Sequence, residues 1–149
     1  MTKTNNVQEG TRRIKFFTDA TVMGLPFIRI NEGDFKGIVF MIDTGSNENV
    51  MFGYAYQLLK DLLRSVEGSI INYGIDGKQV ELNYTCGTFS FCSKEYDMTF
   101  VVREDDIGGK QLSEDVGFPI TGMIGTKFML EHGWMIDFAN QEIVIRGTN

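Results

Sequence analysis

Few residues of this sequence can serve metal or histidine chemistry. The chain has one histidine and two cysteines, whereas zinc sites draw on several such ligands. A Ser–His or Cys–His nucleophile would have to use His132, which lies in a Leu-Glu-His-Gly stretch typical of a helix end. A histidine beside the terminal carbonyls of a helix usually serves structure. We therefore expect no metal site, no cofactor and no histidine-based mechanism.

The two cysteines, Cys86 and Cys92, are too few for a disulfide scaffold. On one continuous strand they would share a face and lie too far apart to bond. A bridge would need a turn at Gly87 that folds the two thiols together. Both are expected to be free thiols unless such a turn forms.

Positive charge and long apolar runs are scarce as well. Lysine and arginine number 14 against 20 acids, which gives a formal charge of −6 and a pI near 4.8. A nucleic-acid binder needs a basic face, and the cluster 12–15 is too small to supply one. No apolar run reaches the ~18 residues of a membrane span, and residues 1–10 lack the apolar core of a signal peptide. We expect no nucleic-acid partner, no membrane partner and a cytoplasmic location, or export if an N-terminal signal has been removed.

The remaining pattern predicts one mostly-β domain over residues 12–149, with residues 1–11 disordered. Short apolar or alternating runs bounded by turn residues predict roughly nine strands. These runs cover residues 12–18, 25–31, 35–42, 70–80 (a hairpin about Asp76 and Gly77), 88–91, 98–102, 118–125, 134–138 and 142–145.

Two helices are expected between these strands. Residues 54–64 carry a stripe at helical spacing that we predict to be core packing. The stripe consists of Ala55, Leu58, Leu59, Leu62 and Leu63. Residues 126–132 predict a short helix with Thr126 as N-cap and Gly133 just beyond its end. Residues 110–117 are expected to be a solvated connection.

One stretch combines a buried strand with chemistry-bearing side chains. Five apolar residues lead into Asp43, and Thr44, Gly45 and Ser46 follow. A carboxylate at the edge of a core loses solvation, so it is either satisfied by nearby donors or chemically poised. The hydroxyls can act as such donors, and the glycine permits a tight turn. Taken alone, the triplet favours a structural Asx-type turn.

The order of motifs along the chain is more specific than the triplet. The strand ending in Asp43 is followed by a glycine-bearing hairpin at 73–77, by a Gly-Met-Ile-Gly segment at 122–125 that opens a short helix, and by a terminal hairpin over 135–145. From about residue 25 to 146 this order resembles the retropepsin-like aspartic proteases, the single-lobe relatives of retroviral proteases and of bacterial aspartyl protease-like proteins. The resemblance implies a mostly-β, single-lobe acid-protease fold, a closed β-barrel with one or two short helices.

The resemblance also implies roles for individual residues. Asp43 would be the catalytic aspartate, with Thr44 and Gly45 completing its loop. Residues 73–77 would form the flap that closes over a peptide, and residues 122–125 would pack beneath the loop. The implied substrate-binding residues are Ser46, Tyr73, Gly74, Ile75, Asp76, Gly77, Met123 and Ile124. Because several of these and Ile42 are apolar, apolar substrate side chains are expected.

One corner departs from the retroviral pattern. Thr126 and Lys127 follow Gly125, where retroviral members have Arg and an acid or amide. An Arg-mediated pairing, and any dimer geometry that relies on it, is therefore not expected at this corner. The segment 103–117 also makes the chain longer than a minimal retropepsin.

Carboxyl-based peptide hydrolysis predicts a second chain. It needs one carboxylate to deprotonate a water and one protonated carboxyl to polarise the carbonyl oxygen. The sequence has a single Asp-Thr-Gly, and Asp137 lacks the hydroxyl and glycine that follow Asp43, so we interpret Asp137 as a structural strand-end acid. A two-fold homodimer would bring Asp43 beside its symmetry mate. The prediction is an aspartic endopeptidase that is active as a homodimer on peptide or protein substrates.

Three other functions use similar residues. Phosphoaspartyl hydrolases need a second Asp two residues after the first, where this chain has Gly45. Actin-like nucleotide-binding proteins need two such domains and a much longer chain. The third alternative is a peptide-binding or regulatory module that has the protease fold without turnover.

Overall fold

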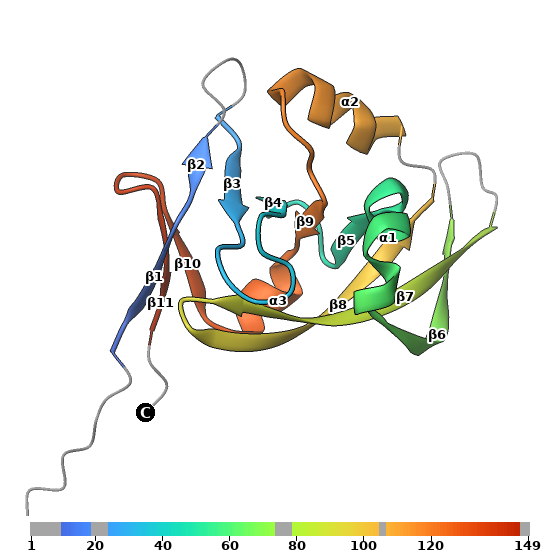
Figure 1. Ribbon diagram of the computed structural model, residues 1–149, viewed down its shortest axis with the longest axis horizontal. Helices are drawn as coiled ribbons and strands as arrows, with labels where there is room; N and C mark the ends of the chain where they lie inside the picture. Colours follow the sequence, from blue (N-terminus) through green and yellow to red (C-terminus); the bar gives the residue numbers. More distant parts are fainter. Residues whose placement is uncertain (1–9, 19–23, 74–78, 105–106, 147–149) are drawn as a thin grey trace, which may run out of the picture.

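The computed structural model describes residues 10–18, 24–73, 79–104 and 107–146, and these residues form a mostly-β structure with few helices (Figure 1). The strands are β1 (Arg12–Lys15), β2 (Phe17–Thr18), β3 (Pro26–Arg29), β4 (Val39–Ile42), β5 (Asn49–Phe52), β6 (Arg64–Tyr73), β7 (Gln79–Phe91), β8 (Lys94–Arg103), β9 (Gly122–Ile124), β10 (Trp134–Asp137) and β11 (Glu142–Ile145). The helices are α1 (Gly53–Leu59), the 3-10 turn η1 (Lys60–Leu62), α2 (Ile107–Val116) and α3 (Thr126–Glu131). None of these helices has the length and apolar character to cross a membrane.

The strands form two sheets. The larger sheet has the order β2-β3-β4-β9-β5-β8-β7-β6, in which β4 pairs parallel with β9 and β5 pairs parallel with β8. The smaller sheet is antiparallel, has the order β1-β11-β10 and lies to one side of the larger one (Figure 1). Short β9, inserted between β4 and β5, therefore joins the C-terminal part of the chain to the strand that leads into Asp43.

Strand β4 is buried along its whole length because a core lies on each of its faces. Phe40 and Ile42 point into the larger core, where Phe40 packs against the rings of Phe89 and Phe100. Val39 and Met41 point into the smaller core. The predicted burial of this strand is confirmed, and the continuous apolar run before Asp43 reflects burial on two sides.

The leucine stripe predicted over 54–64 is only partly core. Helix α1 ends at Leu59 and tightens into η1, so the helical period is not maintained through Leu62. Ala55 is buried and Leu59 packs against the larger core, but Leu58 is 84% exposed and Leu62 is 51% exposed. The prediction that all five residues pack in the core is therefore wrong for these two leucines.

Four other expectations differ from the structure. The strand predicted over 35–42 is a strand only as β4, because the turn before it continues to Gly37. Residues 12–18 are two strands, because β1 pairs with β11 while β2 pairs with β3. Residues 110–117, predicted as a solvated connection, belong largely to α2, which packs on the smaller core through Leu112 and Val116. Of the strand predicted over 118–125, only β9 is a strand. The residues before it are not in a strand, and Phe118 and Ile120 among them pack in the smaller core.

The two cysteines are free thiols. Strand β7 runs straight through Gly87, so the turn that could have brought Cys86 and Cys92 together is absent there. The chain reverses instead at Cys92 and Ser93, both of which have positive φ.

The expected closed barrel is not confirmed. Strands β2 and β6 are the two ends of the larger sheet, and within the described residues no ladder joins them. The structure supports the coarser prediction, a mostly-β protein with few short helices.

Candidate active site

Asp43 directly follows β4, and its backbone is hydrogen-bonded to the neighbouring strand β9. Its backbone N–H donates to the carbonyl of Ile124 at 3.0 Å, which extends by one residue the parallel pairing of β4 with β9. The loop that contains Asp43 therefore begins from a backbone held on one side by β9.

The loop closes on the Asp43 carboxylate itself. The N–H of Gly45 donates to Asp43 Oδ1 at 2.9 Å, and the N–H of Ser46 donates to the Asp43 carbonyl at 3.2 Å. The Asp43 side chain remains partly exposed, and Thr44 and Gly45 are exposed. The turn is the Asx type that the triplet favours; it orients the carboxylate without burying it.

The far side of the loop is bound to the start of α3. The carbonyl of Ser46 accepts from the backbone N–H of Thr126 at 2.8 Å and from its Oγ1 at 3.2 Å, and the carbonyl of Asn47 accepts from the N–H of Lys127 at 3.2 Å. Loop carbonyls therefore satisfy the N–H groups that a helix leaves unpaired at its start. The N-cap is Gly125, so the predicted capping role of Thr126 is wrong by one residue.

Gly125 contacts the loop too closely for any side chain. A Cβ at this position would lie 2.4 Å from the carbonyl oxygen of Glu48 and 2.8 Å from that of Ser46. A Cβ at Gly122 would lie 1.9 Å from the carbonyl oxygen of Val50. Both glycines of the Gly-Met-Ile-Gly segment are thus required because another backbone passes directly against them.

Asn49 is a positioning residue that the sequence analysis missed. Its side chain is buried; Oδ1 accepts from the N–H of Gly125 at 2.9 Å, and Nδ2 donates to the carbonyl of Thr99 at 3.2 Å. Asn49 is the first residue of the buried strand β5, and a buried polar side chain has to be hydrogen-bonded. A polar residue at the start of an apolar run is the one signal in the sequence that could have identified Asn49. Its partners are not predictable from sequence because they come from β8 and from the start of α3.

An ion pair occupies the corner where an Arg-mediated pairing is not expected. Lys127 Nζ lies 2.5 Å from Glu48 Oε1. The hydrogen bond from Lys127 to Glu48 and their charge attraction raise the pKa of Lys127. Tyr84, on β7, is close enough to feel this ion pair: burial, together with the charge of Glu48, raises the pKa of Tyr84. The lysine thus links the first turn of α3 to the loop after Asp43.

The remaining predicted site residues are only partly placed. Met123 is half-buried against the smaller core, and Ile124 is fully buried in the larger one. Tyr73 ends β6 and pairs with Gln79, so the base of the predicted flap is a hairpin. Gly74, Ile75, Asp76 and Gly77, assigned to its tip, lie outside the described residues.

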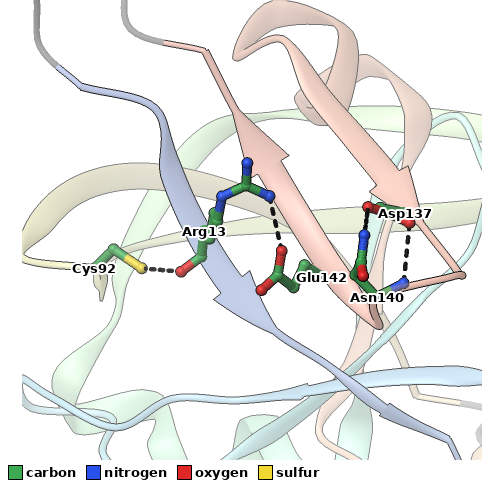
Figure 2. Close-up of polar contacts among 5 residues, drawn as sticks. All are labelled: Arg13, Cys92, Asp137, Asn140 and Glu142. Atoms are coloured by element: carbon green, nitrogen blue, oxygen red, sulfur yellow. Dashed lines mark hydrogen bonds and ion pairs between the residues drawn. The ribbon is translucent and has the colours of Figure 1, made fainter.

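Asp137 has a structural environment, as predicted. It accepts hydrogen bonds from the N–H of Asn140 at 3.1 Å and from its Nδ2 at 2.8 Å (Figure 2). These bonds hold the pKa of Asp137 below its ordinary value. Figure 2 also shows the Arg13–Glu142 ion pair, which joins β1 to β11 at 2.8 Å. The carboxylate of Asp137 therefore fixes the turn between β10 and β11.

The His132 side chain packs against aromatic rings of the core. Its ring lies 4.9 Å from that of Tyr96 and 4.5 Å from that of Phe128, centre to centre. Burial lowers the pKa of His132, Lys94 lowers it further, and Glu131 opposes both. Within the described ranges, no group of three His, Cys, Asp or Glu side chains could hold a metal ion.

Comparison with known proteins identifies the fold. Neither the protein-family models nor the curated proteins give a match. Among solved structures, a retropepsin-like aspartic protease from Rickettsia conorii aligns over 91% of this chain and 90% of its own, with a TM-score of 0.52 and 16% identity. The EIAV protease in complex with the inhibitor HBY-793 aligns over 78% of this chain and 94% of its own, with a TM-score of 0.49 and 19% identity. The chain has the fold of the retropepsin-like aspartic proteases.

Proposed function

We propose that this protein is an aspartic endopeptidase whose catalytic residue is Asp43. The observation that carries the proposal is the loop geometry within a retropepsin-like fold: a partly exposed carboxylate, oriented by Gly45 at 2.9 Å, on a loop held by β9 and α3. A carboxylate that is fixed in direction yet reachable from solvent is suited to act on a bound water.

The reaction requires two carboxyl groups with one proton between them. Two carboxyls about 3 Å apart do not both ionise, so one stays protonated. The ionised group removes a proton from water, which attacks the peptide carbonyl carbon, while the protonated group donates to the carbonyl oxygen. The pair, rather than either residue, then sets the pH profile.

The second carboxyl would come from another copy of the chain. The sequence has one Asp-Thr-Gly, and the hydrogen bonds of Asp137 assign that acid to a turn. In a two-fold dimer the same residue reaches the axis from both sides. The exposure of Thr44 and Gly45 leaves this loop accessible to such a partner.

The peptide would bind in an extended conformation, by strand-like hydrogen bonds. We assign its cover to the hairpin of β6 and β7, with Tyr73, Gly74, Ile75, Asp76 and Gly77 at the tip. Ser46 and Met123, which are half-buried, belong to the proposed floor, and apolar substrate side chains are expected beside them. Ile124 is fully buried in the larger core, so it would support this floor without touching a substrate.

Peptide cleavage by the wild type and by Asp43→Asn tests the proposal. Both proteins are incubated with a pool of peptides between pH 4 and 7, and the products are identified by mass spectrometry. The asparagine cannot serve as the base, so we expect at least ~1,000-fold slower cleavage. Cleavage by both proteins at equal rates would assign the activity to another residue or to a contaminant.

Sedimentation of the same samples separates catalysis from binding alone. A confirmed dimer that cleaves no peptide would favour a peptide-binding module with the protease fold. A protein that stays monomeric at every concentration while cleaving peptides would rule out the symmetric pair of aspartates.

A further inference from the structure

A concave surface lies beside α1, away from Asp43. It has a volume of about 210 Å³. Its walls come from α1, from the chain entering β4, from the segment before β9 and from the end of β3. Its lining includes Arg29, Ile38, Leu58, Leu59, Phe118 and Pro119. We call this surface the α1 groove.

The α1 groove is separate from the candidate active site. Val39, at the first position of β4, lines it, whereas Asp43 follows the last position of the same strand. At about 3.3 Å per strand residue, the two ends lie roughly 13 Å apart. No residue of the 43–46 loop lines the groove.

The walls of the groove are preformed. The N–H of Thr121 donates to the carbonyl of Val39 at 2.9 Å, and the ring of Phe118 packs edge-on against Phe27 at 5.3 Å. The Tyr54 hydroxyl, from α1, hydrogen-bonds to the carbonyl of Ile120 and to Ser113. A ligand would therefore meet a shape that already exists, which reduces the ordering cost of binding.

Leu58 gives the groove an apolar side chain that a partner can reach from solvent. Its side chain is 84% exposed although it stands on the helix that closes one wall. Leu59, Ile38 and Phe118 beside it are half-buried. An exposed leucine next to half-buried apolar side chains offers area that a partner can remove from water.

Arg29 places a positive charge at the same groove. Its Nη1 donates to the carbonyl of Gly37 at 3.3 Å, and its guanidinium lies 5.9 Å from the ring of Phe17. Within the described part of the chain, no carboxylate pairs with this guanidinium. On a protein with a net charge of −6, an unpaired arginine beside apolar side chains favours an anionic group on the partner.

We propose that the α1 groove docks a polypeptide segment in which an acidic side chain stands next to apolar ones. The acidic group would bind Arg29, and the apolar side chains would cover Leu58 and Ile38. The volume is below the roughly 300–1,000 Å³ that enclose small-molecule ligands, so it suits one or two side chains of a longer chain. The site lies outside the proposed catalytic cleft and does not depend on catalysis.

The test uses the full-length chain carrying Asp43→Asn, so that hydrolysis cannot consume the probe. The probes are acetyl-Gly-Leu-Leu-Glu-Gly-amide and its Gln counterpart, titrated into ¹⁵N-labelled protein. The backbone amides of Ile38, Ala55 and Leu59 are the reporters. We expect the Glu peptide to shift them and to bind about fivefold more tightly than the Gln peptide, as one exposed ion pair would give.

Two variants assign the contacts. Arg29→Gln should remove the preference for Glu, and Leu58→Ser should weaken both peptides about tenfold. The matched controls are Lys15→Gln, another exposed cation, and Leu130→Ser, which removes a leucine that is also 84% exposed but lies on α3. Neither control should change binding. Because Leu58 is exposed, its replacement by serine leaves the fold intact, which circular dichroism checks.

Three results would overturn the proposal. The first is equal binding of the Glu and Gln peptides. The second is shifts confined to the 43–46 loop. The third is binding of decanoate at the reporters without binding of either peptide, which would assign the groove to a fatty acid.

Discussion

Gly125 lies against the backbone carbonyls of the loop that follows Asp43. A methyl group there would meet the carbonyl oxygens of Glu48 and Ser46 at 2.4 and 2.8 Å. These are backbone atoms, so relief requires the loop to move away from α3. The same loop orients the Asp43 carboxylate. A substitution at Gly125 therefore alters the position of that carboxylate without contacting it.

Gly125→Ala is therefore expected to destabilise the protein by about 1–3 kcal/mol, the usual cost of overpacking. Urea unfolding measures the change. Peptide cleavage should fall as well, since the loop and its carboxylate shift together. Gly10→Ala is the control, because a Cβ at Gly10 meets no atom within 4 Å. Equal stability of the two variants would contradict the steric argument.

His132 makes stability depend on pH. Burial against Tyr96 and Phe128 lowers its pKa from the ordinary 6.5. The unfolded chain then binds a proton more readily than the folded one, so folding free energy is lost as the pH falls below about 6.5 toward the folded value. We expect a smaller free energy of unfolding at pH 5.5 than at pH 7.5.

His132→Gln isolates this contribution, because the chain has no other histidine. Denaturant unfolding at the two pH values should give a smaller difference for the variant than for the wild type. An unchanged difference would mean that other groups cause the dependence.

At the scale of elements, α2 shows what periodicity alone does not reveal. Its sequence holds adjacent glycines and many polar residues, so it predicted a solvated connection. In the structure it covers the smaller core: Leu112 and Val116 pack there, and Ser113 Oγ accepts from the N–H of Ile120 at 3.1 Å. The helix is stabilised by these tertiary contacts rather than by propensity.

The two glycines of α2 provide a matched pair. A Cβ at Gly109 would lie 2.7 Å from the ring of Phe52, which is buried, whereas a Cβ at Gly108 meets nothing within 4 Å. Gly108→Ala is expected to stabilise the protein by about 0.5–1 kcal/mol through helix propensity. Gly109→Ala is expected to destabilise it by about 1–3 kcal/mol.

Thermal or urea unfolding of both variants measures these changes. Effects of the same sign and size would show that α2 does not pack on Phe52 as described.

Elements were predictable where local pattern and burial agree. The strand before Asp43 and the terminal hairpin followed from short apolar runs, and Gly133 has the positive φ expected just after a helix. The stripe over 54–64 failed at Leu58 and Leu62, because the helix tightens into η1 and the core covers only one part of it. Helical spacing identifies a face but does not tell how much of that face another element covers.

For the whole molecule, a shared active site predicts that activity depends on concentration. If Asp43 needs its counterpart from a second chain, the cleavage rate should rise with the square of chain concentration below the dimer dissociation constant and linearly above it. Initial rates over a wide range of protein concentrations measure this order.

A tandem protein, with two copies joined by a flexible Gly/Ser linker, is the control. Its rate should be linear in concentration throughout, since the second copy is always present. Linear rates from the single chain at every concentration, with a monomer in sedimentation, would contradict the shared site.

The sequence alone determined the features that depend on neighbours along the chain. The apolar run into Asp43, the tight turn at Gly45 and the order of the glycine motifs led to the retropepsin-like fold, and a single Asp-Thr-Gly led to the proposal of two chains. The apolar run and the turn follow from local propensity and periodicity, because the interacting atoms are close in sequence. The fold was predicted from the resemblance of the motif order to a known family.

Only the tertiary structure decided what holds and surrounds the Asp43 loop. The bond from Gly125 to Asn49 joins residues 76 positions apart, and the Lys127–Glu48 pair spans 79. Leu58 and Arg29 of the α1 groove come from segments that approach only on folding. Such contacts depend on β9 lying between β4 and β5, and no pattern in those short strands specifies that order. The physical reason is that strand pairing depends on the geometry of the whole sheet, whereas a turn depends on a few adjacent dihedral angles.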